Sequence, residues 1–566
     1  MKKFLSASLF LLLFTGSPLS AQYQPDHLSK KEIRKAQQWV DKTYDSLSQE
    51  EKLGQLFIVA LYTNKGENEI SNVRNMVRND KIGGLILMQD DAAREIALVN
   101  EFQQKSKIPL MIGMDAEWGV FQRIPAAHKF PWAITLGAIQ DKNLIEKMAA
   151  KIAEDCRRMG INWDFAPVVD VNTNPGNPII GNRSFGSEVN NVVSSALPYA
   201  NGLQHNNILA AIKHFPGHGD TDTDSHLDLP VVSHTRERLN AVEIAPFKAL
   251  MDKGIGGVMV AHLYVPALEP AKGVPASISK NIITGLLKEK LGYKGLIITD
   301  ALNMGAVANK YRPGELDAMA FEAGNDIMLF SQGVAAGKKL IQQAIDQGKI
   351  PQSRLEESVK KILLTKYFLG LDRYEPRTPD HINADLNNDS HKILVRNLYS
   401  NALTLLKDEQ KLLPLTGKPV YYVPLEEAPY QAFADRMGAN IMIKRKEEIR
   451  TIPANSTVIA GLHKDNSTAY KPYKISEASK KILTELAGNN KVILDVFGSP
   501  YALKDIDLSK VSTVLVSYEN NDDSMTATAD AFLGKTKIHG RLPVLVNESL
   551  KPGMGLDLEA SNQTHQ

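Results

Sequence analysis

The hydrophobic pattern of residues 53–330 alternates short apolar runs with longer amphipathic stretches. The runs are nearly continuous rather than alternating, which is typical of parallel strands covered on both faces. Eight of them occur, at residues 55–60, 83–88, 109–115, 162–170, 209–214, 257–262, 295–300 and 325–330. Helical periodicity marks the stretches between them, such as residues 143–159, 192–205, 235–253 and 278–291. This succession predicts an α/β fold built on a (β/α)8 TIM barrel.

A polar stretch without periodicity, residues 372–390, separates this region from a second α/β pattern. We therefore expect a barrel domain at 22–371, a linker at 372–390 and a smaller α/β open-sheet (sandwich) domain at 391–559. The second pattern has apolar runs at 402–407, 420–423, 440–443, 457–462, 491–497 and 513–518, and helical stretches at 391–400, 430–437, 476–487 and 525–533. We expect residues 560–566 to form a disordered tail.

The first 21 residues have the pattern of a secretory signal peptide. Lys2 and Lys3 precede an apolar run at residues 4–14, and small residues end at Ala21 in a pattern typical of a cleavage site. The apolar run is short for a membrane span, so we expect cleavage rather than membrane anchoring. The mature protein is then expected to be exported, into the periplasm or the medium.

The composition and charge of the chain argue against nucleic acid and anionic membranes as binding partners. The chain has 566 residues, of which 43% are hydrophobic and 23% charged, which is typical of a globular protein of two or three domains. Its formal net charge is only +2, and it has no basic run or stripe that would indicate nucleic acid or an anionic membrane as partner. Cys156 is the only cysteine, so no intramolecular disulfide can form, and export without disulfides favours a bacterial periplasm.

Polar side chains gather where the predicted strands of the barrel end. The carboxyl ends of barrel strands meet at one mouth, where the catalytic residues of such folds lie. The residues in these positions are Asp115, Asp164, Asp170, Lys213, His214, His262 and Asp300.

The densest group of titratable residues is the segment KHFPGHGDTDTDSHLDLP, residues 213–230. Burying so many such groups is costly without a purpose, so we interpret the segment as a catalytic loop. Asp224 precedes His226 by two residues and can orient its imidazole, which suits His226 to act as a general acid and then a base. Alternatively, His214, His218 and His226 could bind a metal such as zinc, although their spacing matches no standard metal motif.

Asp300 directly follows the apolar sequence GLIIT. A carboxylate in that place is rigidly held and partly desolvated, as a nucleophile requires. The alternative is that Asp300 caps the next helix. Without a metal, an aspartate nucleophile and a histidine acid/base indicate a two-step displacement on an acetal or ester. We expect no cofactor and no metal.

Residues 213–230 resemble the signature of the β-N-acetylglucosaminidases of glycoside hydrolase family 3. Further segments resemble that family in the same order along the chain. In the barrel they are SLSQEEKLGQLFIV, DAEWGVFQRI, NWDFAPVVDV, GNRSFG and GLIITDALNM, and in the second domain NALTLLKDEQKLLPL, VFGSPY and FLGKTKIHGRLPV. The resemblance extends over nearly all of the chain after residue 21.

The resemblance implies a role for each matching position. Asp300 would be the catalytic nucleophile, His226 the general acid/base and Asp224 the dyad partner of His226. Most retaining glycosidases use two carboxylates instead. The resemblance also implies a set of sugar-binding residues, namely Asp115, Arg123, Arg183, Lys213 and His214. Trp118 and Val120 depart from the family pattern by replacing a glycine and an arginine, and Trp118 could stack on a sugar or fill the barrel rim.

The expected function is therefore that of a retaining exo-β-N-acetylglucosaminidase. It would remove terminal GlcNAc from peptidoglycan fragments or chito-oligosaccharides, with a carbohydrate as its partner, no nucleic acid, and no membrane segment after signal cleavage. Three alternatives stay open: a β-glucosidase or β-xylosidase of the same family, which takes its acid/base from the second domain, a β-GlcNAc phosphorylase, and a non-catalytic cell-wall-binding protein.

Overall fold

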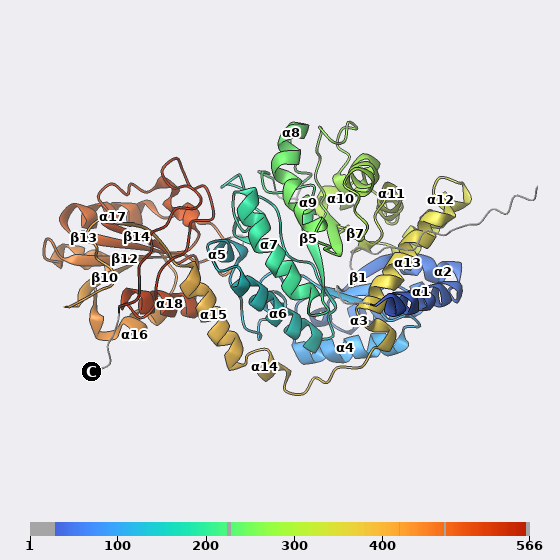
Figure 1. The fold of residues 1–566 in the computed structure, drawn as a ribbon, viewed down its shortest axis with the longest axis horizontal. Coiled ribbons are helices and arrows are strands. Elements are labelled where there is room, and N and C mark those ends of the chain that lie inside the picture. The colour runs from blue at the N-terminus through green and yellow to red at the C-terminus, as the bar shows by residue number, and fades with distance from the viewer. Residues whose placement is uncertain (1–28, 224–227, 418, 469–470, 562–566) are drawn as a thin grey trace, which may run out of the picture.

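The computed structural model describes residues 29–223, 228–417, 419–468 and 471–561. The chain forms two bodies side by side, a larger one coloured blue to yellow and a smaller one coloured orange to red (Figure 1). The predicted signal peptide, residues 1–21, lies outside the described residues, as do residues 562–566 of the predicted tail.

The larger body is a parallel β-barrel. Each of the eight predicted apolar runs contributes one strand, and these are β1 (Phe57–Leu61), β2 (Gly84–Leu87), β3 (Met111–Met114), β4 (Trp163–Asp164), β5 (Leu209–Phe215), β6 (Gly257–Val260), β7 (Leu296–Thr299) and β8 (Met328–Leu329). Their order in the sheet is β7-β6-β5-β4-β3-β2-β1-β8. A parallel bridge between Ile298 and Ile327 joins the two outer strands, so the sheet is nearly closed. The predicted (β/α)8 barrel is confirmed.

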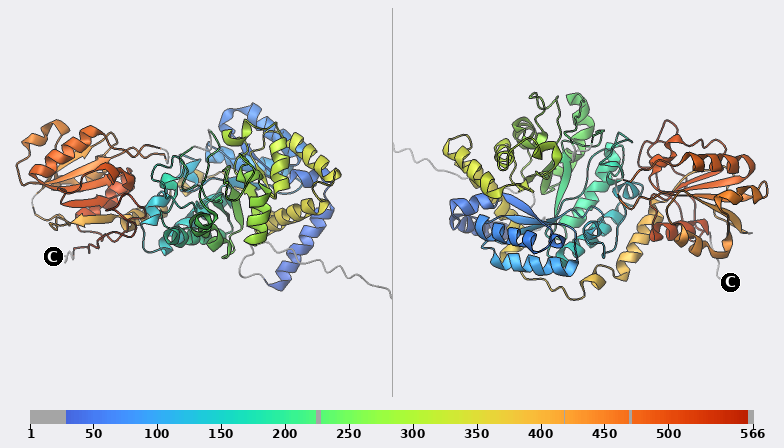
Figure 2. Two further views of the ribbon diagram at one scale, coloured as in Figure 1. Left: turned by 90° about the horizontal axis from the view of Figure 1, so that it is seen from above. Right: turned by 180° about the vertical axis from the view of Figure 1, so that it is seen from behind.

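Helices surround the barrel (Figure 2). They include α1 (Lys30–Asp45), α2 (Gln49–Gly54), α3 (Glu67–Asn75), α4 (Ala92–Lys105), α6 (Asn143–Arg158), α7 (Val189–Gln204), α11 (Glu315–Ala323), α12 (Val334–Asp346) and α13 (Gln352–Phe368). All residues of β2, β3, β6 and β7 are buried, as the continuous apolar runs predicted. The barrel therefore has a packed interior on one face of its strands and a helical layer on the other.

Two predicted elements differ from the structure. The stretch 235–253 is not one helix but α8 (Arg236–Arg238), a π-helical turn η5 (Leu239–Glu243) and α9 (Ala245–Met251). Pro246 lies at the start of α9 and has no N–H to continue the preceding helix. The run 162–170 forms a regular strand only at Trp163–Asp164, because Pro167 cannot donate a ladder hydrogen bond. Beyond Pro167 a single bridge joins Val168 to Lys213.

The smaller body contains a six-stranded sheet of order β11-β10-β12-β13-β14-β9. Its strands are β9 (Thr404–Asp408), β10 (Val420–Leu425), β11 (Ile441–Ile443), β12 (Thr457–His463), β13 (Lys491–Phe497) and β14 (Thr513–Val516). Only β9 is antiparallel to its neighbour. Helices α16 (Gln431–Met437), α17 (Glu477–Asn489) and α18 (Asp522–Phe532) cover both faces (Figure 1). This confirms the predicted smaller open-sheet domain.

The two bodies make direct contact as well as being joined along the chain. Residues 372–390 include the short helix α14 (Ile382–Asp385), and α15 (Asp389–Ala402) then leads into the second sheet. Backbone hydrogen bonds join Arg541 N to the carbonyl of Ala138 and Ser187 N to the carbonyl of Pro543, at 3.0 and 3.1 Å. Across the described ranges, no helix is both long and apolar enough to cross a membrane.

Candidate active site

A pocket of about 620 Å³ lies at the carboxyl ends of the barrel strands. Each predicted site residue that the structure describes lines this pocket, and these are Asp115, Arg123, Arg183, Lys213, His214 and Asp300. The predicted acid/base His226 and its partner Asp224 lie outside the described residues. Other strand-end residues, Asp164, Asp170 and His262, are fully buried behind the pocket rather than part of its lining.

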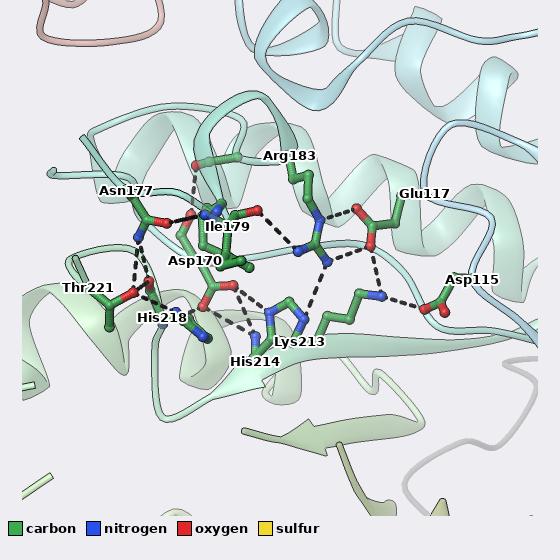
Figure 3. Close-up of polar contacts among 12 residues, drawn as sticks. Asp115, Glu117, Asp170, Asn177, Ile179, Arg183, Lys213, His214, His218 and Thr221 are labelled. Carbon is green, nitrogen blue, oxygen red and sulfur yellow. Dashed lines mark hydrogen bonds and ion pairs between the residues drawn. The ribbon is translucent and has the colours of Figure 1, made fainter. Parts of the chain in front are cut away.

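Lys213 on β5 lies between two carboxylates at the floor of the pocket. Its Nζ is 2.8 Å from Asp115 Oδ1 and 2.9 Å from Glu117 Oε1 (Figure 3). Burial would lower the pKa of the Lys213 ammonium, but the two carboxylates outweigh this effect and raise it. Lys213 is therefore a charged, fixed donor at the end of its strand.

Arg123 completes the environment of Asp115. Its Nη2 lies 2.5 Å from Asp115 Oδ2, on the other side of that carboxylate from Lys213. Burial would raise the pKa of Asp115, but Lys213 and Arg123 hold it well below its usual range. Asp115 is therefore an ionised acceptor held from both sides, as a residue that orients a hydroxyl group must be.

Glu117 is a site residue that the sequence interpretation left without a role. Arg183 approaches it in a bidentate way, with Nε 2.9 Å from Oε2 and Nη2 2.7 Å from Oε1. Burial would raise the pKa of Glu117, but Arg183 and Lys213 outweigh it and lower the pKa to about 2. Glu117 thus joins the loop after β3, the η4 turn (Gly181–Arg183) and β5 (Figure 3). Its position two residues after Asp115 was the available sequence signal.

The ring of His214 is oriented by Asp170. His214 Nδ1 lies 2.8 Å from Asp170 Oδ2, and the backbone N–H groups of His214 and His218 donate to the same carboxylate at 3.2 and 2.7 Å. Burial would raise the pKa of Asp170, but His214 and His218 outweigh it and lower the pKa. On its other side, His214 Nε2 is 3.4 Å from Arg183 Nη2.

His218 lies beside His214, lines the same pocket and is buried. Its Nδ1 is 2.8 Å from the hydroxyl of Thr221. Burial, together with the neighbouring His214, lowers the pKa of His218 to about 4, so this ring is neutral near pH 7. Within the described ranges, no group of three His, Cys, Asp or Glu side chains is arranged to hold a metal ion.

Asp300 follows β7 and faces the pocket from the opposite wall to Asp115. Its Oδ1 accepts the Ala301 N–H at 2.8 Å, and its backbone N–H donates to Val260 at 2.9 Å. Burial would raise the pKa of Asp300, but His214 and His262 outweigh it and lower the pKa. The helix-cap alternative is wrong, since the next helix, α10 (Gly305–Ala308), has Met304 at its N-cap. Asp300 is a partly exposed, ionised carboxylate, as a nucleophile requires.

Asp164 supports the floor from beneath. Its Oδ1 accepts the backbone N–H of Ala116 at 3.0 Å, which fixes the chain between Asp115 and Glu117. Burial raises the pKa of Asp164 to about 8, so the group is largely protonated near pH 7. A neutral acid here adds no further negative charge beneath the two ionised carboxylates.

Comparisons with known proteins agree with this geometry. Residues 48–365 match the family description "Glycosyl hydrolase family 3 N terminal domain". The chain is 34% identical to beta-hexosaminidase A of Pseudoalteromonas piscicida over 82% of this chain and 89% of the relative. It is 30% identical to a beta-N-acetylglucosaminidase/beta-glucosidase of Cellulomonas fimi over 67% of this chain and 68% of the relative.

A solved structure extends the likeness over both domains. The glycoside hydrolase family 3 beta-N-acetylglucosaminidase from Paenibacillus sp. str. FPU-7 is similar with a TM-score of 0.73 and 30% sequence identity. The match covers 89% of this chain and 99% of that chain. On the family match, these relatives and the polar pocket at the barrel mouth, the chain belongs to glycoside hydrolase family 3 and is a glycoside hydrolase.

Proposed function

We propose that this protein is a retaining exo-β-N-acetylglucosaminidase that hydrolyses terminal non-reducing GlcNAc from peptidoglycan fragments or chito-oligosaccharides. The main support is the ionised Asp300 carboxylate, which lines the same pocket as the network of Asp115, Lys213 and Arg183. The names of the relatives, beta-hexosaminidase and beta-N-acetylglucosaminidase, favour GlcNAc as the sugar.

The polar floor suits a sugar ring with several hydroxyl groups. Lys213 and Arg123 present fixed donors, and Asp115 between them presents an acceptor. Arg183 and His214 extend the same surface beside Asp300. Their positions are set by ion pairs that exist before substrate arrives, so binding energy can favour a distorted, oxocarbenium-like transition state.

In the proposed reaction, Asp300 attacks the anomeric carbon and the glycosidic C–O bond breaks, forming a covalent glycosyl ester. His226 donates a proton to the leaving oxygen and later accepts one from the water that hydrolyses the ester. Asp224 orients His226 throughout. The assignment of His226 and Asp224 rests on the sequence alone. Two displacements at one carbon retain the anomeric configuration.

The leader pattern of residues 1–21 supports an exported, periplasmic or secreted protein. Peptidoglycan fragments occur in that compartment, which is why they are proposed as substrates beside chito-oligosaccharides. The alternative activities are those of a β-glucosidase and of a phosphorylase, and both would use the same pocket and nucleophile.

The test is product analysis of the full-length mature chain with chitobiose and with muropeptides. We expect GlcNAc to be released in both cases. With an aryl β-GlcNAc, whose leaving group is not a sugar, the β-anomer of GlcNAc should appear first in the proton NMR spectrum. Initial α-anomer would contradict the double displacement, and cleavage of chitobiose without cleavage of muropeptides would remove the peptidoglycan proposal. Formation of GlcNAc-1-phosphate as the main product in phosphate buffer would favour the phosphorylase.

A further inference from the structure

The pocket is bordered by residues of the second domain as well as the barrel. Ser467 and Thr468, which follow β12, lie at its rim and are exposed, whereas Lys213 and Arg183 at its floor are buried. If an exo-acting enzyme binds the terminal sugar at the floor, the rest of the substrate extends outward past this rim. The second domain then lies beside the leaving group.

Asn466 fixes this rim. Its side chain is buried, its Nδ2 donates to the carbonyl of Tyr518 at 3.0 Å, and its Oδ1 accepts the Asn520 N–H at 3.1 Å. Tyr518 has a φ of 63°, a backbone conformation that non-glycine residues rarely adopt, so the surroundings specify the turn here. The segment 518–520 after β14 therefore sets the position of Ser467 and Thr468.

The middle residue of that segment, Glu519, reaches into the barrel domain. Its carboxylate is fully buried and accepts the backbone N–H of Trp132 at 2.8 Å and the Thr135 hydroxyl at 2.9 Å. It also forms an ion pair with Lys129 Nζ at 2.8 Å. These contacts fix the start of helix α5 (Ala133–Gly137), whose N-cap residue Trp132 makes no side-chain cap hydrogen bond.

Helix α5 begins at the wall of the pocket, which its N-cap residue Trp132 lines together with Trp118. The ring of Trp132 is buried, and its centroid lies 4.2 Å from that of Trp118, at an interplanar angle of 57°. Lys129 Nζ lies 4.2 Å from the centroid of the Trp132 ring, so the same ammonium contacts the ring and Glu519. Trp118 is partly exposed and lines the pocket. A continuous series of contacts thus runs from Glu519 through Trp132 to Trp118.

We propose that Glu519 is a positioning residue through which the second domain sets the leaving-group side of the pocket. The inference rests on the proposed function. One side of that region is the aromatic ring of Trp118, and the other is the hydroxyl-bearing rim of Ser467 and Thr468. A second pyranose ring, with an apolar C–H face and hydroxyl edges, matches this pairing of surfaces. The terminal sugar, held by the barrel floor, does not depend on Glu519.

The proposal is tested with Glu519→Ala and Glu519→Gln in the full mature chain. Two quantities are compared: the KM for chitotriose, which needs the leaving-group side, and the inhibition constant of free GlcNAc, which fills only the floor. We expect Glu519→Ala to raise the KM about 10-fold or more, since small misplacements of binding groups have effects of this order. The inhibition constant of GlcNAc should change by less than about 2-fold, as expected for a distant site.

Matched variants separate positioning from general damage. Glu519→Gln keeps one acceptor oxygen, which can receive both the Trp132 backbone N–H and the Thr135 hydroxyl but not the Lys129 ion pair, and should recover most of the wild-type KM. Trp118→Ala should reproduce the rise in KM while leaving the contact between the domains intact. Tyr501→Phe is the control, because it removes a different buried hydrogen bond between the domains, Asn172 Nδ2 to Tyr501 Oη at 2.7 Å, and should leave both constants unchanged. If Glu519→Ala does not fold, Thr135→Val removes one of the same contacts and is measured instead.

A fluorescence measurement, which needs no substrate, distinguishes failure of this proposal from failure of the proposed function. In the absence of substrate, Glu519→Ala should increase acrylamide quenching of tryptophan emission, and a Trp118→Phe background should reduce that increase. Equal changes in KM and in the GlcNAc constant, or no change in either, would overturn the positioning role. If the wild type released no GlcNAc, the proposed function would fail, while unchanged quenching would independently overturn the contact from Glu519 to the pocket wall.

Discussion

Nδ1 of His214 lies 2.8 Å from Oδ2 of Asp170, and this contact fixes which nitrogen of the ring faces the pocket. A carboxylate can only accept, so the neutral ring carries its proton on Nδ1. Nε2 is then an acceptor, consistent with the donor Arg183 Nη2 at 3.4 Å. His214 is thus presented to the substrate in one orientation, and its neutral form in one tautomer.

Asp170→Asn should reduce activity, although residue 170 does not line the pocket. The side-chain amide that this substitution introduces can donate to Nδ1 and so reverse the tautomer of His214. Loss of a hydrogen bond to a charged group costs about 1.5–3 kcal/mol, which corresponds to a fall of roughly 10–100-fold in kcat/KM. Steady-state kinetics on an aryl β-GlcNAc measure this, with Thr221→Ser as a control that keeps the hydroxyl partner of His218. Unchanged kinetics for Asp170→Asn would contradict the orienting role.

Glu117→Gln should destabilise the fold in a pH-dependent way. The folded-state pKa of Glu117 is about 2, below the ordinary value of 4.5, so its ionisation stabilises the fold above about pH 4.5 and this contribution is lost as the pH falls towards 2. The variant should lose about 1–3 kcal/mol of unfolding free energy at pH 6. Urea denaturation at pH 6 and at pH 3.5 should show the difference from wild type shrinking at the lower pH. A difference independent of pH would mean that Glu117 acts through shape alone.

Asp164→Asn tests the opposite case. Burial raises the pKa of Asp164 to about 8, above its ordinary value of 3.8. Between these values the unfolded chain releases a proton that the folded chain keeps, so the free energy of unfolding falls as the pH rises. Asparagine keeps an acceptor for the Ala116 N–H and cannot ionise. We therefore expect the variant to gain stability relative to wild type between pH 5 and pH 8. Thermal unfolding at the two pH values measures this, and a constant difference would exclude ionisation of Asp164 in this range.

The dependence of activity on pH follows from the proposed roles. Asp300 must be ionised to attack, and its pKa is lowered, so activity should fall only at low pH on the acidic side. His226 must be protonated to assist the leaving group, so activity should also fall as the pH rises through the pKa of that ring. A plot of kcat/KM against pH should be bell-shaped, and in Asp224→Asn the limb on the basic side should shift to lower pH. A flat profile would contradict the pairing of Asp300 with a histidine.

Most of the barrel could be predicted from the sequence, because strands buried on both faces are continuous apolar runs. The exception was residues 162–170, where Pro167 interrupts the ladder after Asp164 and only a single bridge, between Val168 and Lys213, follows. The break in the stretch 235–253 could have been expected from Pro246, but the helical periodicity of the whole stretch predicted one continuous helix. In both cases a proline, which lacks a backbone N–H, interrupts an element that the hydrophobic pattern alone predicts to be continuous.

The contacts within the site were less accessible from the sequence. The position of Asp300 after an apolar run predicted that it would face the barrel mouth. The bidentate pairing of Glu117 with Arg183 joins residues 66 positions apart, and no spacing rule reaches that far. The contact of Glu519 with Trp132 joins residues 387 positions apart in different domains. Such pairs depend on how finished elements pack, which periodicity does not encode.

The most direct test of the account is hydrolysis of aryl β-GlcNAc against aryl β-glucoside by wild type, Asp300→Asn and His226→Ala. We predict that wild type prefers the GlcNAc substrate and that both variants lose activity by about 10²-fold or more, since a nucleophile and an acid/base each contribute on this order. Thermal unfolding close to that of wild type would show that the variants are folded. Glucoside cleavage that survives His226→Ala would contradict the account, because the acid/base would then lie elsewhere and the GlcNAc assignment would lose its support.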